Sequence, residues 1–445
     1  MTKFNREKAL NQLEMKKKSK KYAKYLSIGI PCLVAVISVF YFAYAKFSTS
    51  DENDIVSKTV VGDFMKGDMV LAYTIDGTAG TGSFPSQNTG YEGSSVTCDN
   101  SATATWDNTT WSIKMTSMGT GSRIKCTVAF KSQETKTISG VTFKLNTFSP
   151  DFTTSACTTC DTKEAGVFAA ADDTGTSYYY RGSVTNNYVS FAGKTWRIVR
   201  INGDGTVRII LNGTTGTNSQ INASYSDNTY VGYMYGATGQ TTQAATHANT
   251  NDSKLKQAID TWYESNLKTS YASYLADSGF CGDRKPLATN TTAGTGTVTS
   301  YYNGYGRVVA SRPSLKCLQT NDLYTTSSAS TGNKALKYPI ATITADEVLM
   351  AGSSGGVFDG SWNYTKASTS YLNINTTYWT MTPAGGYVPY DGNSSWFAHV
   401  FAVIASGYVD DWYVAGTFGV RPVVNLKSDA IKSGTGTSND PYVVS

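Results

Sequence analysis

The fold is decided by residues 189–211, which read VSFAGKTWRIVRINGDGTVRIIL. Apolar and β-branched residues fill the two halves of this stretch, and Asn202-Gly203-Asp204-Gly205 separates them. Asn-Gly and Asp-Gly tolerate the positive φ of tight hairpin turns, so the stretch predicts a β-hairpin. The aspartate in this turn could imitate a calcium loop, but the further carboxylates that such a site needs are missing.

The same kind of pattern continues along most of the chain. Gly, Thr, Ser, Asn and Tyr dominate, charged residues make up only 16%, and Gly or Asn-Gly turns separate short β-branched or aromatic runs. This composition predicts a β-rich α+β protein. One helix is indicated at residues 252–267, where apolar residues recur at helical spacing and Ser253 or its two predecessors can cap the start.

Residues 63–146 contain several strand-like runs separated by turns. Their spacing predicts an Ig-like β-sandwich. Cys98 and Cys126 lie in two of the runs and bracket Trp106 and Trp111, which is typical of a disulfide packed against an indole. No carboxylate cluster marks a site in this part of the sequence, so a spacer role is favoured over ligand binding.

Seven cysteines are present, and Cys32 falls in an apolar segment near the N-terminus. The other six form an even set, which in an extracellular chain indicates three disulfides. The connectivity is open, but proximity along the chain favours three pairs: Cys98–Cys126, Cys157–Cys160 and Cys281–Cys317. Zinc is disfavoured because one C-x-x-C pair and two histidines offer too few ligands, so we expect no metal and no other cofactor.

The N-terminus combines a basic tail with an apolar run. Residues 1–24 hold nine Lys or Arg and two Glu, a net +7 that leaves −2 for the rest of a chain whose total is +5. We expect no nucleic-acid partner, because phosphate binding needs a basic patch on the folded body. The run from Tyr25 to Ala45 carries no charge and can span a hydrocarbon core of about 30 Å.

Lysines before this run and acidic residues after it predict a single-pass anchor with a cytoplasmic N-terminus and an extracellular C-terminal part. Cleavage near Ala45, which would release the chain, is the alternative; the apolar run is longer than that of a usual signal peptide. The predicted organisation has six parts: a basic tail (1–24), a membrane anchor (25–45), a juxtamembrane linker (46–62), a β-sandwich spacer (63–146), a linker with the C-x-x-C pair (147–176) and a C-terminal α+β domain (177–445).

The C-terminal part carries an ordered set of motifs besides the helix with its Trp-Tyr pair: F-x-G-x-x-W-R-I at 191–198, I-T-A-D-E-V at 343–348, Y-W-T-M-x-P at 378–383 and G-V-R-P-V-V-N-L at 419–426. Over residues 178–444 this set resembles an uncharacterised domain family in surface proteins of Gram-positive bacteria. It is also similar to the C-type-lectin-like fold of formylglycine-generating-enzyme relatives and retroelement-diversified variable proteins.

That second resemblance implies a C-type-lectin-like domain whose closing strand contains Gly419, Val420 and Arg421. It does not imply oxidase activity, because no cysteine follows Cys317. Lectin-type calcium motifs of the Glu-Pro-Asn or Trp-Asn-Asp kind are also missing from the sequence.

Between residues 383 and 419, aromatic and short polar residues are interleaved with Gly and Ala, a composition that paratopes favour. In a lectin-like domain this segment would face the ligand. The alternative is that the aromatic residues only line loops around core residues such as Phe397, Phe401 and Val403. We predict a ligand-binding site made by these residues: Tyr387, Tyr390, Asp391, Asn393, Trp396, His399, Tyr408, Asp410, Asp411, Trp412 and Tyr413.

These features predict a membrane-anchored, adhesin-like protein that presents a lectin-like recognition domain to an extracellular glycan or protein. A structural cell-envelope role without a specific ligand is the main alternative. Catalysis is not expected. His399 with Asp410 or Asp411 lacks a nucleophile motif, and Asp346 and Glu347 are adjacent and must diverge on either a helix or a strand.

Overall fold

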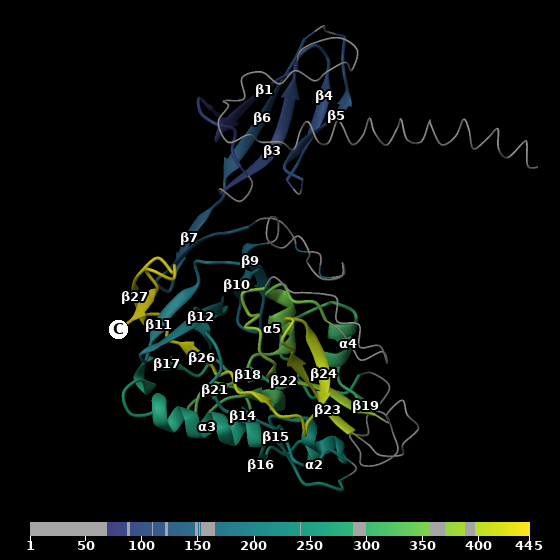
Figure 1. The fold of residues 1–445 in the computed structure, drawn as a ribbon, viewed down its shortest axis with the longest axis vertical. Helices are drawn as coiled ribbons and strands as arrows, with labels where there is room; N and C mark the ends of the chain where they lie inside the picture. Colours follow the sequence, from purple (N-terminus) through teal and green to yellow (C-terminus); the bar gives the residue numbers. More distant parts are fainter. Residues whose placement is uncertain are drawn as a thin grey trace, which may run out of the picture. The chain divides into compact units, whose positions relative to one another are not determined.

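The computed structural model describes residues 69–86, 90–108, 110–120, 123–146, 150, 152, 165–240, 242–287, 300–355, 370–387 and 397–445. Strands dominate these residues and helices are few, as the composition predicted (Figure 1). The predicted tail, membrane anchor and juxtamembrane linker lie outside the described residues. Within the described ranges, no helix is long and apolar enough to cross a membrane. The chain divides into two compact units, Met1–Ser132 and Gln133–Ser445.

The first unit contains a four-stranded sheet and a hairpin. β1 and β6, the two central strands of the sheet, pair in parallel. The other strand pairs of this unit are antiparallel. The sheet has the order β2-β1-β6-β3, with β1 Met69–Ile75, β2 Thr78–Ala79, β3 Tyr91–Cys98 and β6 Ile124–Ser132, and the hairpin joins β4 Thr103–Asp107 to β5 Ser112–Ser117.

A disulfide anchors the small core of this unit. Cys98 of β3 lies opposite Cys126 of β6 and bonds to it, with 4.0 Å between the Cα atoms. The bridge therefore joins neighbouring strands of one sheet, whereas the disulfide of antibody domains joins two sheets. Trp106 packs against the apolar cluster that contains Cys126, and its ring meets Trp111 edge-on at 5.4 Å. The disulfide and the indoles thus share one core.

The second unit is built around two larger sheets. The predicted hairpin is present as β12 and β13, which lie in the middle of the ten-stranded sheet. The order of this sheet is β17-β26-β13-β12-β11-β28-β27, with β10 also pairing with β12, β9 with β10, and β21 with β26. Its strands are β9 Gly166–Ala171, β10 Thr176–Arg181, β11 Tyr188–Phe191, β12 Lys194–Ile201, β13 Val207–Leu211, β17 Leu275–Ala276, β21 Ile340–Ala341, β26 Val423–Leu426, β27 Ile431–Ser433 and β28 Tyr442–Val444.

The six-stranded sheet has the order β14-β25-β22-β23-β24, with β19 also pairing with β22. Its core includes Phe401 and Val403, as the sequence predicted. Its strands are β14 Asn218–Ser219, β19 Ser300–Tyr301, β22 Tyr378–Tyr387, β23 Phe397–Val403, β24 Val409–Tyr413 and β25 Phe418–Gly419.

The implied closing strand at residues 419–421 does not form as one element. Gly419 ends β25 of the six-stranded sheet, and the next strand, β26, starts at Val423 in the ten-stranded sheet. Arg421 lies between them, fully buried, and its guanidinium donates to the carbonyls of Leu211 (2.9 Å) and Leu372 (2.7 Å). The chain therefore crosses from one sheet to the other here, and the arginine satisfies carbonyls at the crossing.

Short elements complete the second unit. The predicted helix is present as α3, where the Ser253 hydroxyl caps the Lys256 amide at 3.1 Å. Three further helices were not predicted, because at four to seven residues they are too short to show a helical period. The remaining elements are β7 Thr135–Ile138, β8 Val141–Lys144, β15 Met234–Tyr235, β16 Asn251–Asp252, β18 Phe280–Cys281, β20 Leu323–Tyr324, α2 Gln243–Thr246, α3 Lys254–Asn266, α4 Asn303–Val309, α5 Ala345–Met350, η1 Asn228–Val231, η2 Ala272–Tyr274 and η3 Thr320–Asp322.

The boundary between the units differs from the predicted one at residue 146. Strands β7 and β8 belong to the second unit, and Val141 and Phe143 are buried in its main core. The Tyr442 hydroxyl donates to the carbonyl of Thr142 at 3.0 Å. A strand with one apolar face looks the same in sequence whichever core it covers, so its pattern could not assign it to a unit.

Candidate functional site

Four residues form a row across one end of the six-stranded sheet. The register pairs Tyr301 of β19 with Gly385 of β22, Gly385 with His399 of β23, and His399 with Tyr413 of β24. Residues directly opposite each other in antiparallel strands project from the same face. Tyr301, His399 and Tyr413 therefore share a face, and Gly385 places no side chain of its own between the first two. We call these four residues the aromatic row.

One end of the aromatic row reaches solvent. Tyr413 is 41% exposed, and its ring lies edge-on to Tyr225, which is 39% exposed, with 6.1 Å between the centroids. At the other end, Tyr301 stacks on Tyr305 of α4 at 4.2 Å. Burial, with Tyr301 and Asp411 nearby, raises the pKa of Tyr305 to about 12, so this phenol stays neutral at physiological pH.

Asp411 orients the histidine in the middle of the row. Its Oδ2 lies 2.8 Å from Nδ1 of His399, and its side chain is 2% exposed. Asp411 projects from the same face as His399 because it lies diagonally across the β23–β24 pair. In the neutral imidazole, an Nδ1 proton shared with the carboxylate leaves Nε2 as an acceptor, and a protonated ring offers Nε2 as a donor.

The other predicted residues of β24 face elsewhere. Asp410 and Trp412 alternate with Asp411 and Tyr413, so they project from the opposite face of the sheet. Asp410 is 3% exposed, and Trp412 packs edge-on to Phe418 at 5.6 Å. The prediction that all of these residues share one recognition face is therefore wrong, since a strand divides consecutive residues between its two faces.

Of the remaining six predicted residues, the structure describes two. Tyr408 precedes β24 and is buried, with 8% of its surface exposed. Tyr387 is the last residue of β22. The other four lie outside the described residues, in the connection between β22 and β23: Tyr390, Asp391, Asn393 and Trp396.

A cavity of about 600 Å³, lined mostly by charged and polar residues, is a second feature of this unit. Its walls come from segments far apart in the chain: the β9–β10 turn, β12, β13, the β17–β18 connection, residues 314–320 and the start of α5. Seven carboxylates and four cationic side chains line it: Asp172, Asp173, Asp204, Asp277, Asp283, Asp346, Glu347, Arg200, Arg208, Arg307 and Lys316.

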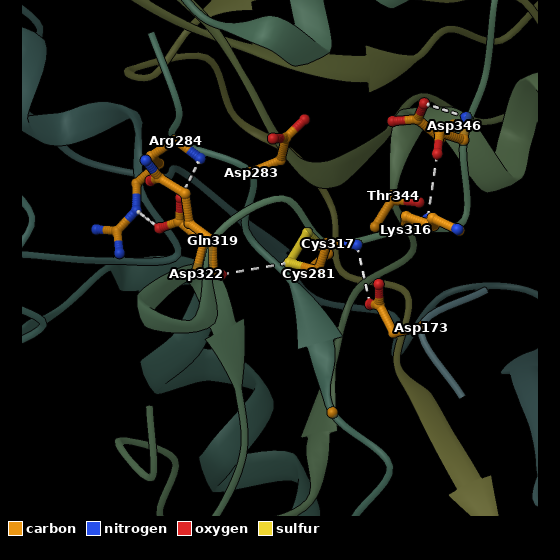
Figure 2. Close-up of a disulfide and its surroundings, with 12 residues drawn as sticks. Asp173, Cys281, Asp283, Arg284, Lys316, Cys317, Gln319, Asp322, Thr344 and Asp346 are labelled. Carbon is orange, nitrogen blue, oxygen red and sulfur yellow. Dashed lines mark hydrogen bonds and ion pairs between the residues drawn. A yellow bond between two sulfur atoms is a disulfide. The ribbon is translucent and has the colours of Figure 1, made fainter. Parts of the chain in front are cut away.

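The second disulfide forms part of the cavity wall. Cys281 of β18 bonds to Cys317, and both residues line the cavity. Figure 2 shows this bridge with Asp173, Asp283 and Asp346 around it. The Cys317 amide donates to Asp173 at 2.9 Å. The bridge therefore holds the segment from 314 to 320 against the end of β18. Cys157 and Cys160, the third predicted pair, lie outside the described residues.

Two adjacent acidic residues of α5 contribute to the wall separately. Asp346 receives two hydrogen bonds from Arg307, at 2.6 and 2.8 Å. Glu347 accepts from Arg208 at 2.6 Å and from Arg200 at 3.0 Å. Their divergence on a helix, expected from the sequence, gives each carboxylate its own arginine partners.

Within the described part of the chain, no group of three or more His, Cys, Asp or Glu side chains is placed to hold a metal ion. No protein-family model, curated protein or solved structure matches the chain. The resemblance drawn from the C-terminal motifs therefore stays a prediction.

Sequence reasoning missed Tyr225, Tyr301 and Tyr305, which lie around the aromatic row. It also missed the cavity. The run YYNGY at 301–305 was a possible signal for the tyrosines, but its place beside β22 depends on strand pairing across more than eighty residues. Each cavity residue is an ordinary polar residue in its own segment, and no motif links them.

Proposed function

We propose that the chain is a cell-surface recognition protein that is anchored by residues 25–45 and binds an extracellular oligosaccharide at the aromatic row. The observation that carries the proposal is the pair Tyr225 and Tyr413. Both rings are exposed, they contact each other, and Tyr413 continues into a row that includes His399. Exposed aromatic clusters are uncommon in the absence of a partner.

The chemistry of the exposed end of the row suits a hydroxyl-rich ligand. This end is formed by Tyr413 and Tyr225, and His399 lies next to Tyr413 in the neighbouring strand. Tyrosine rings provide rigid apolar faces with polar hydroxyls at their edges. His399, oriented by Asp411, adds a polar side chain beside the exposed rings.

In this role the first unit is a spacer without a ligand of its own, and the protein binds its ligand without catalysing a reaction. A C-type-lectin-like fold for the second unit is part of the proposal, supported by the motif set described above. Binding to a protein surface and a purely structural envelope role are the alternatives that experiment must separate.

The test uses the full-length chain in lipid nanodiscs on a glycan array and, in parallel, on a panel of extracellular proteins. The double variant Tyr225→Ala/Tyr413→Ala removes both exposed rings. Val443→Ala, an exposed apolar residue of the other sheet, is the matched control. Each aromatic contact contributes about 0.5–1.5 kcal/mol, so glycan affinity should fall about tenfold in the double variant and stay unchanged in the control.

Glycan binding that survives in the double variant would place the site elsewhere. Binding only on the protein panel would replace the oligosaccharide by a protein ligand. If the native chain binds on neither array, the recognition role is wrong and the structural envelope role takes its place.

A further inference from the structure

The cavity beside the Cys281–Cys317 disulfide holds buried acceptors that have no partner among the described residues. They are Oδ1 of Asn202, Oδ1 of Asp277 and Oδ1 of Asp283, and all three residues line the cavity. Asp283 is itself only 5% exposed. A buried polar atom without a hydrogen bond is costly, so such atoms call for an explanation.

The arginines on the same wall are already engaged. Arg200 donates to Asp172 at 2.9 Å and to Glu347. Arg208 donates to Glu347 and to the carbonyl of Gly279. The guanidinium groups of Arg200 and Arg208 thus have protein acceptors, and the remaining cation of the wall besides Arg307 is the exposed Lys316, while the three acceptor oxygens have no partner among the described residues. A ligand that satisfies these three oxygens brings donors.

The net charge of the cavity also favours a positively charged ligand. Seven carboxylates face four cationic side chains, which leaves an excess of three negative charges when all are ionised. The excess is also local, because the single guanidinium of Arg307 bridges two carboxylates, Asp283 and Asp346. A positively charged donor next to Asp283 would balance that excess.

We propose that this cavity binds a small organic cation that carries an ammonium group, with Asp283 as the carboxylate that receives the ammonium and Asp277 and Asn202 as acceptors for further donors. This site is separate from the aromatic row and does not depend on the function proposed for it. A bare metal ion fits less well, because the described carboxylates of the cavity are not clustered as metal ligands.

The titration of Asp283 supplies an independent signature. Burial raises the pKa of Asp283 to about 6, and Asp346 and Asp322 add to the rise while Arg307 of α4 opposes it. Below this pH the carboxyl is protonated and no longer attracts an ammonium group. Binding should therefore strengthen as the pH rises through 6.

The experiment is isothermal titration of the purified full-length chain with glucosamine and with cadaverine, and with N-acetylglucosamine as the neutral counterpart. The variants are Asp283→Asn and Asp277→Asn, which keep the side-chain shape but replace an acceptor oxygen by a donor. Asp429→Asn makes the same change at an exposed position outside the cavity.

We expect an amine to bind at about pH 7 and N-acetylglucosamine not to bind in the cavity. Losing a charged acceptor should weaken amine binding by about tenfold or more in Asp283→Asn, with a smaller loss in Asp277→Asn and none in Asp429→Asn. Affinity of the native chain should fall by a similar factor at about pH 5.

Each of these results would overturn the proposal: neither amine binds; the neutral sugar binds as well as the amine to the Tyr225→Ala/Tyr413→Ala variant, which lacks the exposed rings of the aromatic row; or amine binding to the native chain is the same at both pH values. The last measurement uses only the native chain, so it decides the matter even if Asp283→Asn fails to fold. Loss of amine binding in the Tyr225→Ala/Tyr413→Ala variant would also contradict it, since that variant leaves the cavity intact.

Discussion

Replacing Glu347 by glutamine should strongly destabilise the second unit. This carboxylate is 4% exposed and lies between two arginines, and its Oε2 also accepts from the Thr344 amide at 3.1 Å. Burial alone would raise the pKa of Glu347, but Arg208 and Arg200 outweigh it and hold the pKa at about 2. Glutamine keeps the shape of the side chain and removes the charge that both guanidiniums need.

The size of the effect follows from the pKa and from the partners left behind. A fall from 4.5 to about 2 corresponds to about 3 kcal/mol, at about 1.4 kcal/mol for each pKa unit. In the variant, Arg200 keeps Asp172, but Arg208 loses its carboxylate partner. Breaking a buried ion pair on one side costs about 3–5 kcal/mol, which agrees with the first figure.

The pH dependence has a definite sign. A carboxyl whose pKa is lowered on folding stabilises the protein above its unfolded pKa, and this stabilisation is lost as the pH falls toward the folded pKa. The difference between the native chain and Glu347→Gln should thus be full above 4.5 and should shrink between 4.5 and about 2.

Urea unfolding of both proteins at a series of pH values measures this difference. The control is Glu264→Gln, an exposed glutamate that accepts from Lys337 at 2.8 Å, and we expect no resolvable change for it. If Glu347→Gln unfolds at the same urea concentration as the native chain near neutral pH, the buried pair does not stabilise this fold and the reasoning fails.

Two further predictions concern the cavity wall. Replacing Cys281 and Cys317 together by serine removes a cross-link between residues 36 apart, which the loop-entropy model values at about 4 kcal/mol; urea unfolding of the native chain and of this variant under oxidising conditions should show that difference. The pKa of Asp283 is raised from 3.8 to about 6, so the folded state binds the carboxyl proton of Asp283 more tightly than the unfolded state does. The free energy of unfolding should therefore fall by about 3 kcal/mol as the pH rises from 3.8 to 6. Asp283→Asn should remove that fall, and an unchanged pH profile would contradict the assignment.

Local pattern was sufficient for the elements that make their contacts close in sequence. The hairpin of β12 and β13 follows from the Asn-Gly and Asp-Gly turn, and α3 follows from apolar spacing behind a capping serine. The disulfides Cys98–Cys126 and Cys281–Cys317 are two of the three pairs that proximity favoured. For the hairpin and the helix a short stretch of chain carries the whole signal, whereas for the disulfides proximity only ranked pairings that the sequence left open.

The sequence predicted only part of the candidate site. Composition drew attention to His399, Asp411 and Tyr413, but it could not separate them from Asp410 and Trp412, because the phase of a strand depends on which face is buried. Tyr225 joins the site through a ring contact with Tyr413, and Tyr301 joins it through strand pairing with Gly385. Neither contact can be predicted from the residues next to these tyrosines in the sequence.

What the sequence alone determined is therefore the β-rich class, one hairpin, one helix and a segment rich in recognition-type residues. Only the tertiary structure decided which residues of that segment share a face, where the first unit ends, and that buried acids and arginines enclose a cavity. The physical reason is that period and turn chemistry act over a few residues, whereas strand pairing and the burial of charge depend on residues brought together from distant parts of the chain.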